Sequence, residues 1–194
     1  ELGGAFARYD FMATIEEKSG GKLPRTEDLE TEGGLATMRG ILEGAGVDHS
    51  RLTNAAQLLD KLSSTYIEPL CTQPSFIVDY PLCMSPLAKE HRTRKGLSER
   101  FECFVLGREL ANAYTELNDP REQRIRFEEQ MRLREQGDDE AQQPDFCFCD
   151  ALELGMPPTA GWGLGIDRLC MVMLDKASIR EVQFFPTLRP LAGE

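Results

Sequence analysis

A pair of β-rich runs, 101–106 and 109–114, constrains the fold of this chain most strongly. The two residues between them, Gly107-Arg108, have the spacing of a tight β-hairpin. Three carboxylates (Glu102, Glu109 and Glu116) and one amide (Asn112) interrupt otherwise apolar sequence. A charge inside a strand is costly to desolvate unless a cation pairs with it. These positions therefore either face solvent or surround something cationic.

A second feature follows in the segment 161–174, GWGLGIDRLCMVML. Three glycines at alternate positions lie in a predicted strand that leads into an apolar helix, and glycine leaves room for a flat ligand against the backbone. The helical spacing predicts a buried stripe formed by Ile166, Leu169, Cys170, Met173 and Leu174. Arg168 lies off that stripe in the first turn, so we expect it to face a cleft at the positive end of the helix. Trp162 is interpreted as a core residue.

The remaining pattern is one of short strands separated by helices, without regular β-α-β alternation. We expect helices at 11–18 (capped by Asp10), 27–46, 53–68 (capped by Thr53), 120–136 (capped by Asn118 or Asp119) and 145–154, and strands at 74–80 and 182–185. In the helix 120–136, Glu122 and Arg126 are expected to form a solvated i,i+4 pair. The whole predicts an α+β domain built on an antiparallel sheet flanked by helices.

The charge composition disfavours one class of function, nucleic-acid binding. The chain has 33 acidic and 22 basic residues and a net charge of −11, so it is not expected to be the main nucleic-acid-binding part of a protein. The basic segment 89–100 is the one candidate for contact with RNA, and a solvated loop is the alternative. The glycines follow neither the dinucleotide-binding nor the P-loop pattern.

Six cysteines and two histidines show no zinc-ligand spacing, so we expect reduced, mostly buried thiols. We see no membrane-spanning run and no signal peptide. A cytoplasmic protein is the resulting expectation.

Four motifs resemble one known family in their order and spacing. The segment 109–120, ELANAYTELNDP, resembles the lysine-site signature of class II lysyl-tRNA synthetases, and 157–168, PPTAGWGLGIDR, resembles their motif 3. SPLAK at 85–89 and FPTLRP at 185–190 match in the same order, so the resemblance runs from about residue 6 to residue 190.

The resemblance implies that residues 1–194 are the C-terminal portion of a class II catalytic domain, with a small helical lobe at about 25–70. The parent enzyme would join lysine to ATP, form lysyl-adenylate and transfer lysine to tRNA(Lys), as a homodimer in the cytoplasm. We find no motif 1 and no motif 2, whose arginine holds the α-phosphate. We therefore expect no lysine-dependent ATP–pyrophosphate exchange from the chain alone.

The resemblance also assigns roles to individual residues. Glu102 and Glu109 would share Mg²⁺, while Asn112 and Glu116 would bind lysine, Glu116 at the ε-ammonium group. Arg168 would be the catalytic arginine, stacked on adenine and reaching the outer phosphates. The residues expected at ATP are Glu109, Leu110, Gly163, Gly165, Ile166, Asp167 and Arg168. Because Glu109 and Asn112 have opposite parity along a strand, a β-bulge is required if both serve one cleft.

Three alternatives stay open. A paralogue of these synthetases could lysylate a protein instead of tRNA, or the chain could be a non-catalytic module that binds ATP or a partner. An aspartate- or asparagine-specific relative is less favoured, because a carboxylate at Glu116 suits a cationic substrate. Purely structural roles are also possible for these carboxylates. They predict that Glu102 and Glu109 are exposed strand residues and that Glu116 pairs with a nearby arginine.

Overall fold

A computed structural model describes residues 3–138 and 141–186. The strands are β1 (Ala7–Asp10), β2 (Ser75–Val78), β3 (Arg100–Val105), β4 (Arg108–Thr115) and β5 (Ala160–Leu164). The helices are α1 (Phe11–Ser19), α2 (Glu32–Gly44), α3 (Ala55–Tyr66), α4 (Pro120–Glu135), α5 (Phe146–Glu153) and α6 (Ile166–Met173). Short 3-10 turns occur at Thr26–Asp28, Glu68–Leu70, Leu82–Met84 and Ile179–Glu181.

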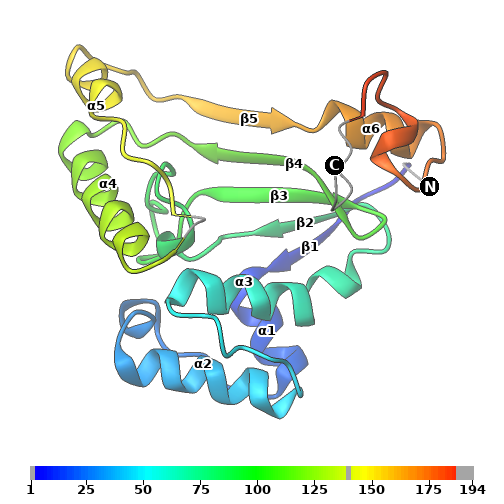
Figure 1. Ribbon diagram of the computed structural model, residues 1–194, viewed down its shortest axis with the longest axis horizontal. Coiled ribbons are helices and arrows are strands. Elements are labelled where there is room, and N and C mark those ends of the chain that lie inside the picture. The colour runs from blue at the N-terminus through cyan, green and yellow to red at the C-terminus, as the bar shows by residue number, and fades with distance from the viewer. Residues whose placement is uncertain (1–2, 139–140, 187–194) are drawn as a thin grey trace, which may run out of the picture.

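The five strands form one sheet in the order β1-β2-β3-β4-β5 (Figure 1). All neighbouring pairs are antiparallel except β1 and β2, which are parallel. Helices α1 to α3 lie along one side, α4 and α5 at one end, and α6 at the other end. The predicted α+β architecture is confirmed, and β1 is the strand that the sequence analysis missed.

The β3–β4 hairpin is present, but its turn is one residue earlier than predicted. Val105 pairs with Arg108, so Leu106 and Gly107 form the two-residue loop. Their φ angles are 55° and 69°, the two positive values that a type I′ turn requires. A leucine rarely adopts this conformation, so the sequence alone favours Gly107-Arg108 as the turn.

The predicted bulge is also present. Glu102 pairs with Asn112 and Cys103 with Ala111, but Phe104 pairs with Glu109, so Leu110 is an extra residue in β4. Leu110 and Ala111 belong to one apolar cluster on the same face of the sheet. The bulge therefore returns Glu109 to the face that Asn112 occupies.

That shared face, called the inner face here, carries the main core. Ile77 and Phe104 pack there against α1 and α3, in a cluster that includes Phe11, Leu58 and Leu62. The opposite face holds a smaller cluster of Cys103, Val105 and Ala111, with Leu110, Leu164 and Val172 packed against it.

Local capping explains where the helices begin. Asp10 accepts a hydrogen bond from the N–H of Ala13 at 3.0 Å, and Asp119 caps α4 directly before Pro120, as predicted. The cap of α3 is Asn54 rather than Thr53. Arg126 pairs with Glu122 at 3.0 Å but is buried rather than solvated, because its guanidinium donates to the carbonyls of Ser85 and Ala88.

Three expectations near the C-terminus were wrong. In α6 the buried residue is Met171, whereas Ile166, Met173 and Leu174 of the expected stripe are exposed. Trp162 is 66% exposed, and 182–185 forms no strand among the described residues. Leu169 and Cys170 of the same stripe are half-buried, so the described chain covers that apolar side of the helix only in part. Residues 187–190 of the FPTLRP motif lie outside the described residues.

Two further expectations concern the cysteines and the membrane. Cys71, Cys103 and Cys149 are buried free thiols, as expected, while Cys147 is exposed. Within the described residues, no helix is both long and apolar enough to cross a membrane.

Candidate active site

Two rows of paired residues build the site on the inner face. Glu102, Asn112 and Gly163 lie opposite one another across β3, β4 and β5. The next row holds Arg100, Tyr114 and Gly161. Directly opposed residues on neighbouring strands project to the same face, so this patch combines the predicted metal, lysine and nucleotide residues.

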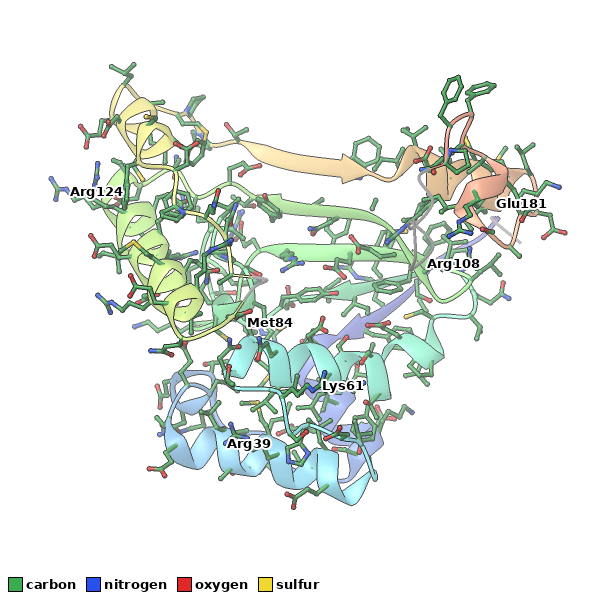
Figure 2. All side chains as sticks on the ribbon, viewed as in Figure 1. Arg39, Lys61, Met84, Arg108, Arg124 and Glu181 are labelled. Carbon is green, nitrogen blue, oxygen red and sulfur yellow. The ribbon has the colours of Figure 1, made fainter. Side chains whose placement is uncertain are left out.

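Two cavities that share lining residues lie along the inner face, and together they are called the cleft here. One cavity of about 400 Å³ includes Met84, and a second of about 390 Å³ includes Arg108; these labelled residues lie near opposite ends of the sheet (Figure 2). Both cavities are lined by the same three carboxylates, Asp60, Glu68 and Glu102. The cleft is therefore acidic along its length.

Glu109 and Arg168 meet in the second cavity. The Arg168 guanidinium donates to the Glu109 carbonyl at 2.5 Å and lies 3.6 Å from its carboxylate. Burial raises the pKa of Glu109, and the nearby charge of Glu102 raises it further. A half-exposed arginine close to this pair is available to phosphate oxygens that enter the cavity.

The pair Glu102 and Glu109 fits the predicted magnesium site. Mg²⁺ takes one or two protein carboxylates and completes its shell with water and phosphate. Among the described residues no group of three or more His, Cys, Asp or Glu side chains is arranged to hold a metal ion. The mutual repulsion that raises the pKa of Glu109 is what a divalent cation would relieve.

Glu116 occupies the other part of the inner face, beside Gly161. A methyl group on Gly161 would lie 1.8 Å from Glu116 Oε1, so the carboxylate fills the space that glycine leaves. Burial raises the pKa of Glu116. Within the described part of the chain, no Lys, Arg or His forms an ion pair with Glu116, and the local arginine partner considered from the sequence is absent.

The SPLAK segment borders the same region. Ala88 forms a β-bridge with Glu116, and the N–H of Lys89 donates to the Thr115 carbonyl at 2.7 Å. Two of the motifs identified in the sequence are thus side by side in space.

The other residues expected at ATP occupy varied positions. The N–H of Gly165 donates to the Leu110 carbonyl at 2.9 Å and starts α6 next to Arg168. The Leu110 side chain packs on the opposite face, Ile166 is 60% exposed, and Asp167 accepts a hydrogen bond from Gln183. Only Glu109, Gly163, Gly165 and Arg168 of this set thus lie along the inner-face cleft or at its border.

Several arginines of the basic segment 89–100 form ion pairs with acidic residues of the same chain. Arg92 pairs with Glu99 at 2.5 Å, and Arg94 contacts both Asp10 and Asp79. The arginine fork holds the pKa of Glu99 at about 2. Both arginines are thus held by ion pairs within the fold, while the Arg92 side chain stays 76% exposed, and contact of this segment with RNA remains a prediction.

The sequence analysis did not identify Arg100 and Tyr80 as site residues. Tyr80 donates to Glu102 Oε2 at 2.7 Å, and Arg100 lies 2.5 Å from Glu102 Oε1. A signal existed for Arg100, which precedes Glu102 by two strand positions and so shares its face. Tyr80, Asp60 and Glu68 are brought to the cleft by packing between segments that are distant in sequence. Local sequence patterns therefore do not predict their place in the site.

Comparisons with known proteins agree with this geometry. A family model described as tRNA synthetases class II (D, K and N) matches residues 1–189, and the chain belongs to this family. Within it, the chain is similar to lysine–tRNA ligases. It is 56% identical over 185 residues to a probable cytoplasmic lysine–tRNA ligase of Vairimorpha ceranae, an alignment covering 95% of this chain and 36% of the relative.

Two further relatives are also described as lysine–tRNA ligases. The lysine–tRNA ligase of Porphyromonas gingivalis (strain ATCC 33277) is 52% identical over 185 residues, covering 95% of this chain and 31% of the relative. Lysine–tRNA ligase cla4 of Cladosporium cladosporioides is 47% identical over 182 residues, covering 94% and 31%. The chain thus spans about a third of the length of the curated relatives it matches.

Proposed function

We propose that the protein carrying this sequence is a lysine–tRNA ligase, which activates lysine with ATP and transfers it to tRNA(Lys). Glu116 is the observation that carries the proposal. It is a carboxylate with a burial-raised pKa and no cationic partner among the described residues, on a sheet face that also bears a candidate metal pair. Such a group favours a substrate that brings its own cation, and it disfavours substrates that would leave it unpaired.

The proposed chemistry joins the lysine carboxylate to the α-phosphorus of ATP and releases pyrophosphate. Glu116 would hold the ε-ammonium group and Asn112 the opposite end of lysine, so that the nucleophilic carboxylate is oriented. Arg168 would stabilise charge on the outer phosphates as the leaving group departs. Gly163 and Gly165 would leave the adenine room to lie against the β5 backbone.

Mg²⁺ held by Glu102 and Glu109 would neutralise phosphate charge in this step. The observation that supports this fit is the closeness of two carboxylates in one cavity with Arg168 beside them. We further propose that residues 1–194 form the C-terminal part of the catalytic domain, with the helices at about 25–70 as a lobe of it, and that the full protein is a cytoplasmic homodimer.

The direct test is lysine-dependent ATP–pyrophosphate exchange by the full-length natural protein that carries this sequence. Glu116→Gln keeps the volume but removes the charge, and we expect it to raise the KM for lysine at least tenfold while the KM for ATP changes little. Glu135→Gln, at an exposed position of α4, is the matched control. Equal effects of the two variants would contradict the proposal.

The acceptor needs a separate assay. Transfer of radiolabelled lysine to tRNA(Lys), compared with transfer to protein, separates a tRNA ligase from a protein-lysylating paralogue. Lysine incorporated only into protein would reject tRNA as the acceptor and leave the activation step intact.

A further inference from the structure

Arg100 lies between the proposed metal pair and the proposed lysine residues. Its side chain is 16% exposed and lies on the inner face, beside Glu102 and Asn112. Nη2 is 2.5 Å from Glu102 Oε1, and Nε donates to Asn112 Oδ1 at 3.2 Å. One guanidinium group therefore contacts a residue from each half of the site.

The guanidinium is itself fixed from the outside. Nη1 donates to the Met84 carbonyl at 2.8 Å and to Ser85 Oγ at 3.0 Å. The group also lies over the Tyr80 ring, 4.5 Å from its centroid. Because contacts on several sides define its position, Arg100 has little freedom to rotate.

Tyr80 completes the arrangement at Glu102. Its hydroxyl donates to Oε2 while Arg100 contacts Oε1, so both carboxylate oxygens are oriented. The remaining lone pairs of Glu102 are directed by these two bonds. Asn112 is oriented in the same way, because its Oδ1 accepts from Arg100 and its amide group is then directed away from that bond.

We propose that Arg100 is a positioning residue that couples the metal half of the site to the lysine half by fixing Glu102 and Asn112 together. This inference rests on the proposed function. Only an arginine suits the position, because its planar fork presents separate donors to Glu102, Asn112 and Ser85. A lysine ammonium carries the same charge, but its three donors share one nitrogen and cannot reach acceptors spread across the width of a guanidinium group.

The experiment compares Arg100→Lys and Arg100→Gln in the full-length protein, with lysine and Mg²⁺ each titrated in the exchange assay. We expect both variants to raise the KM for lysine and the Mg²⁺ concentration for half-maximal rate together, by about tenfold or more, since charge-assisted hydrogen bonds are lost. Arg92→Lys is the matched control, because Arg92 is 76% exposed and, among the described residues, forms an ion pair with Glu99 alone.

A double variant separates positioning from general stability. Asn112→Ala removes the acceptor of the Arg100 bond, so we expect Arg100→Lys to add less to the KM for lysine in that background than in the wild type. Fully additive effects would overturn the inference. An Arg100→Lys enzyme with a wild-type KM for lysine and a wild-type Mg²⁺ requirement would also overturn it. So would variants whose melting temperature and active fraction fall while the KM for lysine and the Mg²⁺ requirement stay unchanged.

The same experiment distinguishes this inference from the proposed function. A wild-type protein without lysine-dependent exchange would overturn both. An active wild type with unaffected Arg100 variants would overturn the positioning role alone.

Discussion

Replacing Gly161 by alanine is the sharpest perturbation of the site. The added Cβ would lie 1.8 Å from Glu116 Oε1 and 2.9 Å from its Cδ, whereas ordinary van der Waals contacts begin near 3.4 Å. The carboxylate must therefore retreat by more than an ångström. Because it ends a flexible side chain, the retreat costs the fold little, and only the position of the charge is lost.

The size of the effect follows from that displacement. A hydrogen bond to a charged group contributes about 1.5–3 kcal/mol. Losing one such bond to the ε-ammonium group corresponds to about a 10- to 150-fold weaker interaction with lysine. We therefore expect the KM for lysine to rise within this range, while the melting temperature and the KM for ATP change little.

Two glycines of the same chain serve as comparisons. A Cβ on Gly163 would meet only the Asn112 carbonyl, at 3.8 Å, so Gly163→Ala is expected to leave the KM for lysine unchanged. Gly40→Ala, on an exposed part of α2 with nothing within 4 Å, controls for the exchange of residue type. A lysine KM for Gly161→Ala equal to that of the wild type would refute the assignment of Glu116 as the ammonium partner.

Two further predictions concern charge and stability. The pKa of Glu109 is raised above its ordinary value of 4.5. Its charged form therefore lowers the free energy of unfolding at high pH. This loss becomes smaller as the pH falls through the folded-state pKa and is absent below 4.5. Protonation should also displace Mg²⁺. The Mg²⁺ concentration for half-maximal exchange should therefore begin to rise on acidification above pH 4.5, and a flat profile down to that pH would contradict the raised pKa. Separately, Arg126→Ala should lower the free energy of unfolding by about 2–4 kcal/mol in urea titrations, because the Ser85 and Ala88 carbonyls lose a buried donor. Arg121→Ala, at an exposed position of the same helix, should change it by less than about 0.5 kcal/mol, and similar losses in both variants would refute the role of Arg126.

Much of the fold could be predicted from local signals. Asp10 and Asp119 mark helix starts, because short acidic side chains satisfy free N–H groups in the first turn. The parity of Glu109 and Asn112 even required a bulge between them. Its location could not be predicted, because it depends on Leu110 and Ala111 packing together against residues far away in sequence.

The failures share one physical cause. The apolar stripe of α6 and the ring of Trp162 are real features of the sequence, but burial also requires a surface to pack against. Composition and spacing do not show whether such a surface exists. The burial of Arg126 was not predicted because a surface that covers it does exist but is distant in sequence. Its hydrogen-bond partners are backbone carbonyls of the 85–88 segment.

The candidate site was predicted in part. The residues of the hairpin, Glu102, Glu109, Asn112 and Glu116, share one face because strand period and bulge act together. Arg100 was readable from the same period, as it lies two positions before Glu102. Tyr80 comes from the loop after β2 and needed the strand order before it could be placed.

The extra residue in β4 reverses the alternation of side chains, so the faces occupied by the residues before and after Leu110 are set separately. Deleting Leu110 would restore an unbroken ladder and turn either Glu109 or Asn112 toward the opposite face, although neither side chain had been altered. Scans that exchange one side chain for another would never expose this dependence. Changes of chain length at this point are therefore a class of inactivating lesion that leaves every site residue intact.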